Sequence, residues 1–335
     1  MFAGIAIGLI LFVGLALLAR EIFPVVPYAY QTINNRSNDD APRIATLGNS
    51  HARAISFETL NIQGVDLWIG GSDLFETNQM AQKIIDDVPS AHTLLIAFSP
   101  GLLYLNSSYR HLSYGFCQSS SRTKVYQIQP TGYWSLIDGD LIGWFCTHVT
   151  LVRLYGNWEY LWRKLHCVIE LKKGCFAAKP PGRLIDLKKP FRKKYVDRRA
   201  KMHEKRIRSS LKHAPNTFNR TLSTLTDLVS YATRKGVNVV LYDSPTSQAY
   251  RININQRLAD LKTTYEPEQR FGNWYSSMKK AGACVYYIKN LWNTDSDGRQ
   301  RGWYQNADHL NKAGAVEFSA RLAPTLRSIQ RCGKS

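Results

Sequence analysis

The sequence predicts an α/β protein with a flavodoxin-like, three-layer α/β/α fold around a five-stranded parallel sheet. Two observations lead to this fold class. Short apolar runs alternate along the chain with longer stretches of helical apolar spacing, as in the βα units of parallel sheets. Residues 93–98 (TLLIAF) form an almost continuous apolar run, which is typical of a central parallel strand covered by helices on both faces.

The elements follow in order along the chain. Strands are expected at residues 44–47, 65–69, 93–98, 237–242 and 284–288. Helices are expected after Ser50, over 73–87, from about 217 to Gly236, over parts of 256–280 and over 311–329. Helical spacing of apolar residues marks the core-facing sides of two of these helices: Leu222, Leu225, Leu228, Val229 and Ala232 in one, and Ala315, Phe318, Leu322 and Leu326 in the last.

The N-terminal segment carries no charged side chain before Arg20. About 20 apolar residues are enough to span a bilayer core. A cleaved signal peptide is the alternative, but it normally starts with a basic region and ends at a small-residue cleavage site, and neither is evident. We therefore expect a transmembrane helix at 1–23, followed by a polar linker at 24–42 whose prolines end the helix.

Residues 101–215 interrupt the alternation of strands and helices, so we expect a large insertion between the two parts of the α/β domain, 43–100 and 216–331. The insertion holds four of the six cysteines, Cys117, Cys146, Cys167 and Cys175. Between Lys172 and Lys212 it carries sixteen Lys and Arg against three acidic residues, and residues 196–212 are expected to form a basic helix. Loops of this kind commonly shape substrate pockets.

The net charge of +19 predicts attraction to a polyanion. Three interpretations of the basic stretch remain open: a solvated charged face, contact with anionic lipid or an acidic glycan, and nucleic-acid binding. The last is the least favoured, because no zinc finger, RNP-type motif or Gly-rich loop accompanies the charge. The expected anion-binding residues are Lys188, Lys189, Arg192, Lys193, Lys194, Arg198 and Arg199.

The six cysteines permit three disulfides with fifteen connectivities, which favours an oxidising compartment. Cys167 and Cys175 are close enough in sequence to close a local loop. No Cys-x-x-Cys pair is present, so no zinc site is expected. The sequence predicts no metal and no cofactor.

Two short segments carry candidate chemistry. Gly48-Asn49-Ser50 follows the first strand and precedes a helix, a turn that can present the serine hydroxyl above the sheet edge, beside helix amides that suit developing negative charge. Such tripeptides also cap helices in many proteins. His309 lies just ahead of the last helix, so the serine and the histidine could meet at one edge of a parallel sheet.

With these segments, the chain resembles the SGNH (GDSL-like) hydrolase superfamily over roughly 43–100 and 217–329. Gly48-Asn49-Ser50 stands where the family has Gly-Asp-Ser, and His51 follows as in several envelope-acting branches. Residues 65–72 (VDLWIGGS) resemble the second block, in which a glycine, here Gly71, donates an amide. Residues 306–315 (NADHLNKAGA) resemble the last block, with His309 as the base.

The resemblance also implies an acid and an oxyanion hole. The aspartate expected three residues before the histidine is Asn306 here. The neighbouring Asp308 could supply a charge, although in extended backbone we expect its side chain to point elsewhere. Asp243 and Asp295 are more distant substitutes.

The amides of Ser50 and Gly71 would bind the oxyanion, with Ser99 or Asn106 as a third donor, since residues 97–100 (AFSP) do not match the family's third block. His51 could tune the site, but we expect a solvated role for it.

The resemblance implies a membrane-anchored, extracytoplasmic serine esterase or O-acyltransferase acting on a cell-envelope polysaccharide or glycolipid. A multi-spanning membrane acyltransferase would be its partner, as for relatives that complete such acyl transfers. The alternative is a catalytically weak or inactive module that keeps the fold and binds anionic glycan, lipid or a membrane-protein partner.

Overall fold

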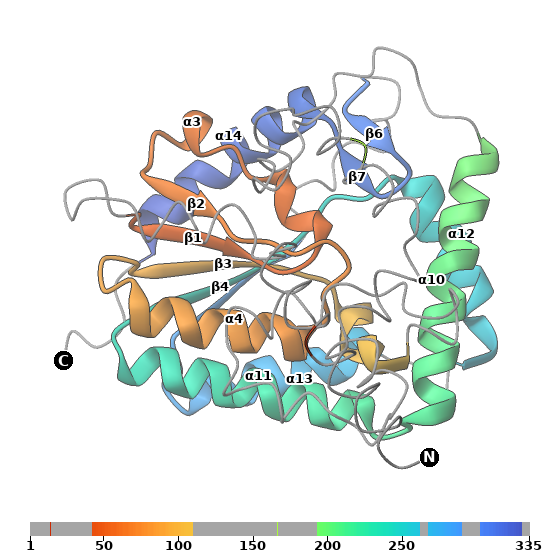
Figure 1. The fold of residues 1–335 in the computed structure, drawn as a ribbon, viewed down its shortest axis with the longest axis horizontal. Coiled ribbons are helices and arrows are strands. Elements are labelled where there is room, and N and C mark those ends of the chain that lie inside the picture. The colour runs from red at the N-terminus through yellow and green to blue at the C-terminus, as the bar shows by residue number, and fades with distance from the viewer. Residues whose placement is uncertain are drawn as a thin grey trace.

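The structure, a computed structural model, describes residues 42–109, 193–261, 267–289 and 302–329, and the single positions 14 and 166. Its centre is a five-stranded sheet in the order β2-β1-β3-β4-β5 (Figure 1). All four neighbouring pairs are parallel, and this is the strand order of doubly wound, flavodoxin-like sheets. The predicted α/β fold with a five-stranded parallel sheet is confirmed.

The strands lie close to their predicted positions. They are β1 (Ile44–Leu47), β2 (Gly64–Asp66), β3 (Thr93–Phe98), β4 (Asn238–Asp243) and β5 (Val285–Ile288). A separate hairpin near the C-terminus pairs β6 (Tyr304–Asn306) with β7 (His309–Leu310).

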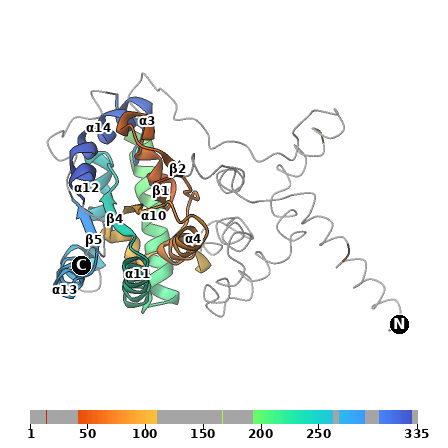
Figure 2. The same cartoon turned by 90° about the vertical axis from the view of Figure 1, so that its left-hand side faces the viewer.

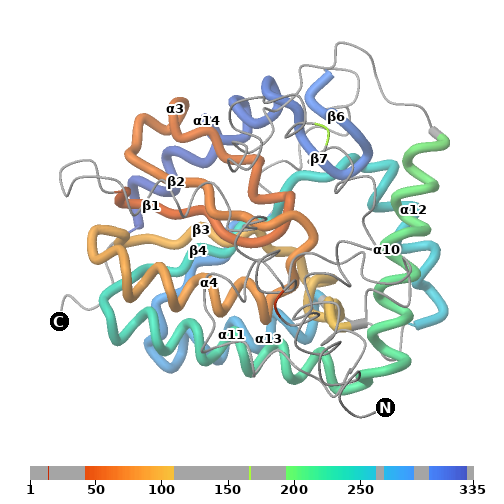
Figure 3. The backbone as a smooth tube through the Cα atoms, viewed as in Figure 1, coloured from red at the N-terminus to blue at the C-terminus, as the bar shows by residue number. Residues whose placement is uncertain are grey.

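The described helices are α3 (Phe57–Leu60), α4 (Leu74–Asp87), α10 (Lys193–His213), α11 (Thr217–Arg234), α12 (Gln248–Arg257), α13 (Pro267–Lys280) and α14 (Lys312–Ser328). Short 3₁₀ turns lie at η2 (Ser50–Ala54), η3 (Pro100–Tyr104), η4 (Ser107–Tyr109) and η6 (Ala259–Leu261). Figure 3 traces the path of the chain through these elements.

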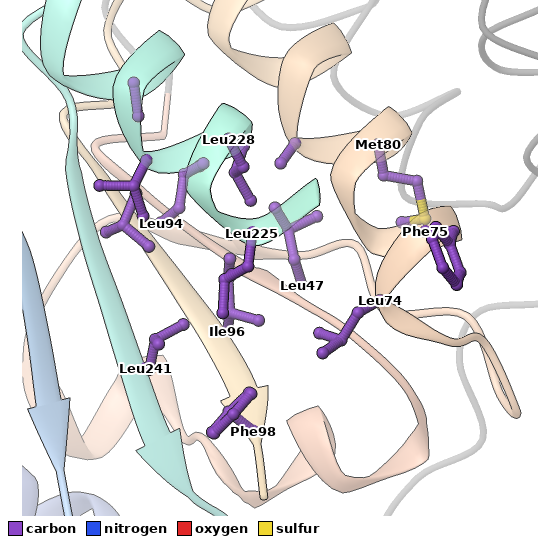
Figure 4. Packing of buried hydrophobic residues seen from close by; sticks show 14 of the residues in the cluster. Leu47, Leu74, Phe75, Met80, Leu94, Ile96, Phe98, Leu225, Leu228 and Leu241 are labelled. Carbon is purple, nitrogen blue, oxygen red and sulfur yellow. The ribbon is translucent and has the colours of Figure 1, made fainter. Parts of the chain in front are cut away.

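Two hydrophobic clusters hold the layers together. On one face of the sheet, Leu47, Ile96 and Leu241 pack against Leu225 and Leu228 of α11, as Figure 4 shows, and α4 and α13 complete this layer. On the other face, strand residues such as Val240 and Tyr242 pack against η2, α3 and α14. The view in Figure 2 shows helices on both sides of the sheet.

The segment after β2 runs on beside β1. The predicted strand 65–69 ends at Asp66, yet the amides of Leu67 and Ile69 still donate to the carbonyls of Thr46 and Gly48, both at 2.9 Å. This continued pairing carries the chain to Gly71, where φ is +79°, a conformation that favours glycine. The Gly71 turn is thus held at the same end of the sheet as the turn that follows β1.

Helix α10, at the end of the predicted insertion, packs against the α/β domain. Val196 and Ala200 are buried in one cluster and Ile207 in the other. The helix packs along α12 at one end of the sheet (Figure 1).

The remainder of the predicted insertion, the predicted anchor 1–23 and the linker 24–42 lie almost wholly outside the described residues, as do all cysteines except Cys284. Among the helices that the structure describes, none is long and apolar enough to cross a bilayer.

Gly314 provides a test of the packing that places α14. Its amide donates to the capping Asn311 Oδ1 at 2.9 Å, and a Cβ there would lie 2.2 Å from Trp303 O and 3.1 Å from Leu310 Cδ2. We expect Gly314→Ala to lower the free energy of unfolding by about 1–3 kcal/mol in a urea titration. Gly272 in helix α13 is the control, because no atom lies within 4 Å of a Cβ added there. Gly272→Ala should instead raise the free energy of unfolding by about 0.5–1 kcal/mol. Equal effects of the two substitutions would contradict the close packing at Gly314.

Candidate active site

The turn after β1 places Ser50 at the C-terminal end of the sheet. Gly48 has φ +114°, and a Cβ there would lie 3.3 Å from Ala97 O, so a larger residue would be both strained and crowded. Asn49 then caps the 3₁₀ turn, with its Oδ1 accepting from the His51 amide at 3.0 Å. The side chain at position 49 therefore shapes the turn that presents the serine.

The β6–β7 hairpin holds His309. Asn306 pairs with His309 across the hairpin, and Ala307 O at its tip accepts from Ser247 N at 3.1 Å and from Ser247 Oγ at 2.7 Å. These bonds tie the hairpin to the loop after β4. The imidazole is consequently fixed from two sides and only 8% exposed.

The structure brings the two predicted residues together: Ser50 Oγ lies 2.7 Å from His309 Nε2. The other ring nitrogen, Nδ1, lies 3.0 Å from Asn306 Oδ1. That oxygen also accepts from the Asp308 amide at 3.1 Å, so the atom that faces the ring is a carbonyl oxygen and Nδ1 must carry the proton. The lone pair of Nε2 is then directed at the serine hydroxyl, the arrangement that a general base needs.

Asp308 does not point away from the histidine, contrary to expectation. Its side chain is fully buried, with one carboxylate oxygen 3.2 Å from His309 Nδ1. Arg199 binds the same carboxylate in a bidentate manner, through Nε at 2.8 Å and Nη2 at 2.7 Å. Burial alone would raise the pKa of Asp308, but His309, His51 and Arg199 outweigh it and hold that pKa well below its usual range.

Two further histidines surround the Asp308 carboxylate. The His51 ring stacks on His309 with centroids 4.6 Å apart, and its Nε2 lies 3.6 Å from Asp308 Oδ2, so the expected solvated role is wrong. His203 Nε2 lies 3.8 Å from the same oxygen, while its Nδ1 contacts the Tyr250 hydroxyl. Burial lowers the pKa of both His51 and His203 to about 3, so both rings are neutral at pH 7.

Arg199 was predicted to bind an external anion, and its position corrects that prediction, because its guanidinium is bound to Asp308 inside the protein. Lys194 and Arg198 are exposed on α10, and Lys193 is the first residue of that helix. Lys188, Lys189 and Arg192 lie outside the described residues.

Some charged residues of helix α10 are paired within the protein. Glu204 bonds both Arg208 and Arg257, and Asp197 bonds Arg257. The positive charge of α10 is therefore smaller at the α12 side than the sequence alone indicates.

A cavity of about 600 Å³ adjoins the serine, and Ser50, Gly71, Ser99 and Asn106 all line it. The residues predicted to bind an oxyanion thus line the same cavity as the serine hydroxyl. Its size is typical of small-molecule sites. Asp243 also lines this cavity, whereas His309 Nδ1 faces Asn306 and Asp308; Asp295 lies outside the described residues.

His51, Asp308 and His309 each offer one ligand atom within 4.8 Å of the others, so they are the described residues to consider for a metal. Both oxygens of Asp308 already face the Arg199 guanidinium, and His309 Nε2 faces Ser50. A divalent cation would compete with that fixed positive charge. The contacts of these three residues therefore do not fit a divalent cation.

Sequence reasoning missed the contribution of α10 and α12, namely Arg199, His203 and Tyr250. A signal was present: Val196, Ala200 and Ile207 repeat at helical spacing and mark one buried stripe. Arg199 and His203 lie next to that stripe, one turn apart. The stripe indicates a packed face, although it does not say what the face packs against.

Comparison with protein-family models finds no match to this sequence, and comparison with curated proteins finds none either. The resemblance to SGNH hydrolases therefore rests on the motifs themselves.

The buried neutral histidines predict the acid sensitivity of the fold. Unfolding frees His51 and His203 to bind protons near pH 6.5, whereas in the folded state they bind them only near pH 3. The unfolded state then binds more protons between these values, so stability falls as pH drops through this window, by up to about 1.4 kcal/mol per pH unit for each ring. Asp308, whose pKa is depressed, adds a further loss of stability as the pH falls below 3.8, the ordinary pKa of an aspartate.

Replacing the His203 ring tests whether this buried neutral histidine makes stability fall as the pH drops. We expect His203→Gln to make the free energy of unfolding, measured in urea between pH 7 and pH 5, depend less steeply on pH. Lys205→Gln, which removes an exposed positive charge from the same helix, serves as the control and should leave the slope close to wild type. An unchanged slope in His203→Gln would show that this ring has the same pKa in the folded and unfolded states, contrary to the lowered value.

Proposed function

We propose that this protein is a serine esterase or O-acyltransferase of the SGNH type. The observation that carries the proposal is the 2.7 Å contact between Ser50 Oγ and His309 Nε2. Asn306 fixes the ring tautomer from the opposite side, and a cavity of about 600 Å³ lies beside the serine. A hydroxyl, an oriented base and a space for substrate are the parts that acyl transfer through a covalent intermediate requires.

The chemistry follows from these positions. His309 Nε2 takes the proton as Ser50 Oγ attacks the carbonyl carbon of an ester. The tetrahedral intermediate collapses when the protonated imidazole returns that proton to the departing alcohol, which leaves the acyl group on Ser50. Water then regenerates the serine in an esterase, and a sugar hydroxyl does so in an O-acyltransferase, with His309 again acting as base and then acid.

Two side chains divide the role that one aspartate has in the family pattern. Asn306 orients the imidazole through a hydrogen bond, and Asp308 supplies the negative charge that stabilises the imidazolium, from 3.2 Å. The amides of Ser50 and Gly71, with Ser99 as a third group, would bind the oxyanion. Losing a single donor of this kind costs about 2.7–4 kcal/mol of transition-state stabilisation in a well-studied serine protease.

The substrate class and location are proposed from the sequence. A cell-envelope polysaccharide or glycolipid fits an anchor at 1–23, an extracytoplasmic domain with disulfides and the net charge of +19. The exposed Lys194 and Arg198 would meet an acidic glycan or anionic lipid. A multi-spanning membrane acyltransferase is the proposed partner that would deliver the acyl group.

A non-catalytic module is the second candidate function, and one observation favours it. Asn306 carries no charge, and the charge of Asp308 is shared with the Arg199 guanidinium. A base supported in this way is weaker than one beside an unshared carboxylate. Such a module would bind anionic glycan, lipid or a membrane-protein partner.

Ser50→Ala separates these two functions. In the enzyme, the variant should lose turnover of an activated acetyl ester and labelling by a fluorophosphonate probe, because the nucleophilic oxygen is absent. Ser277→Ala, at a serine of helix α13 outside the cavity, is the matched control and should retain both. If wild type and Ser50→Ala release the product at equal rates, the module is the correct function.

If Asn306 orients the His309 ring and Asp308 supplies the negative charge, replacing each residue should have a different effect on catalysis. We expect Asp308→Asn to lower kcat/KM by about 10²-fold or more, since an aspartate-to-asparagine change costs about 10⁴ in kcat in a serine protease triad. Asn306→Ala should cost less, because the Asp308 carboxylate can still accept from Nδ1. Steady-state kinetics on variants with an unchanged circular dichroism spectrum measure both effects. A larger loss in Asn306→Ala would contradict the assignment of the charge to Asp308.

A further inference from the structure

A second polar group lines the cavity at the ends of β4 and β5. The register pairs Phe98 with Asp243 and Leu241 with Tyr287. Side chains two residues apart on a strand share a face, so Phe98, Asp243 and Tyr287 lie on the same face of the sheet. Asp243, Tyr287 and Lys289 all line the cavity that contains Ser50.

The Tyr287 hydroxyl is buried and has no hydrogen-bond partner within the described part of the chain. The ring itself is fixed edge-on against Phe98, with centroids 5.9 Å apart, and against Phe271, at 4.8 Å. The backbone amide of Tyr287 donates to Tyr275 Oη at 3.3 Å. The hydroxyl is thus held in place without a bond, and a buried polar group left in that state costs about 1–3 kcal/mol.

Asp243, a half-buried residue, supplies the second polar group. No hydrogen bond or ion pair to its carboxylate is present among the residues that the structure describes. Burial raises the pKa of this carboxyl to about 6, with Arg251 and Lys289 opposing the shift and Glu268 adding to it. Lys289 is itself paired with Glu268 at 3.0 Å. At pH 7 the carboxylate is therefore an acceptor that protein groups leave unused.

We propose that Asp243 and Tyr287 form a subsite for the hydroxyl groups of a neutral sugar ring, which presents its ester or its free hydroxyl to Ser50. This inference rests on the proposed function and names its substrate more closely. A carboxylate accepts hydrogen bonds from sugar hydroxyls, and a phenol can both donate and accept.

Asp243 lies near Arg251, Lys289 and Glu268, and Lys289 is paired with Glu268. These four side chains carry two charges of each sign, so together they present no net charge to a ligand. A neutral, hydroxyl-rich group satisfies both polar atoms without a charge penalty. Phe98, which packs against the Tyr287 ring, also lines the cavity.

Two substrates separate binding of the sugar from acyl chemistry. We expect Tyr287→Phe and Asp243→Asn each to lower kcat/KM for an O-acetylated methyl glucoside about tenfold, the factor that corresponds to 1.4 kcal/mol. Most of this loss should appear in KM. Turnover of p-nitrophenyl acetate should stay within about twofold of wild type in both variants, because this ester has no sugar hydroxyl to bind at Asp243 or Tyr287. Equal losses on both substrates, or no loss on either, would overturn the subsite.

A matched pair of control variants exists at another surface of the protein. Tyr231 donates to Asp86 between helices α11 and α4, and neither residue lines the cavity. Tyr231→Phe and Asp86→Asn make the same chemical changes and should leave both activities unchanged.

Thermal unfolding adds an independent result. Tyr287→Phe should keep or raise Tm, since the hydroxyl it removes has no partner in the free protein. A lower Tm with unchanged kinetics would assign this hydroxyl to the fold rather than to a ligand.

Binding distinguishes failure of the subsite from failure of the proposed function. If wild type hydrolyses neither ester, saturation-transfer NMR on Ser50→Ala with methyl glucoside as the probe still tests the subsite. Weaker binding when Tyr287→Phe is added would support the subsite in a protein without esterase activity. Binding that is absent, or unaffected by this second change, would overturn it.

Discussion

The ion pair between Arg199 and Asp308 is the interaction on which the arrangement of the site depends. The Asp308 carboxylate has no solvent exposure, and a buried charge is tolerated only when it is paired and hydrogen-bonded. Arg199 supplies two of these bonds from helix α10, and His309 lies against the same carboxylate from the β6–β7 hairpin. Breaking one partner of a buried pair typically costs about 3–5 kcal/mol. Docking of α10 and formation of the site are therefore linked.

This pairing has a chemical consequence for the proposed enzyme. A carboxylate that faces a guanidinium stabilises a developing imidazolium less than an unshared carboxylate would. The neutral His51 and His203 rings leave the charge of Asp308 directed at Arg199 and His309. Asn306, meanwhile, decides the tautomer of His309 without carrying charge. Orientation and charge thus come from different side chains, and an enzyme built in this way should be slow rather than inactive.

Much of the fold could be predicted from the sequence because its signals are local. The apolar run of β3 and the helical spacing in α11 are set by residues close together in the chain, and both elements lie within one or two residues of their predicted bounds. Gly48 and Gly71 marked turns that do adopt positive φ. Ser50 and His309 could be paired because Ser50 follows the C-terminal end of a parallel strand and His309 lies just ahead of the last helix, which the sequence places at the same edge of the sheet.

The remaining parts of the site were not predictable, for a physical reason in each case. Arg199 was assigned to a solvated surface, because composition shows that a stretch is basic and cannot show which cation meets a buried carboxylate. The direction of Asp308 depends on a tight hairpin rather than on an extended strand. The unsatisfied hydroxyl of Tyr287 depends on the packing of Phe98 and Phe271 around its ring, which no local pattern records.

The most direct measurement of the central claim is the chemical identity of the acylated residue. The full-length protein would be mixed with an activated acetyl ester, quenched in acid within a single turnover, digested and mapped by mass spectrometry. We expect one acetyl group on the peptide that contains Ser50, and none there when His309 is replaced by alanine. An acetyl group on another residue, or labelling of Ser50 that is independent of His309, would contradict it.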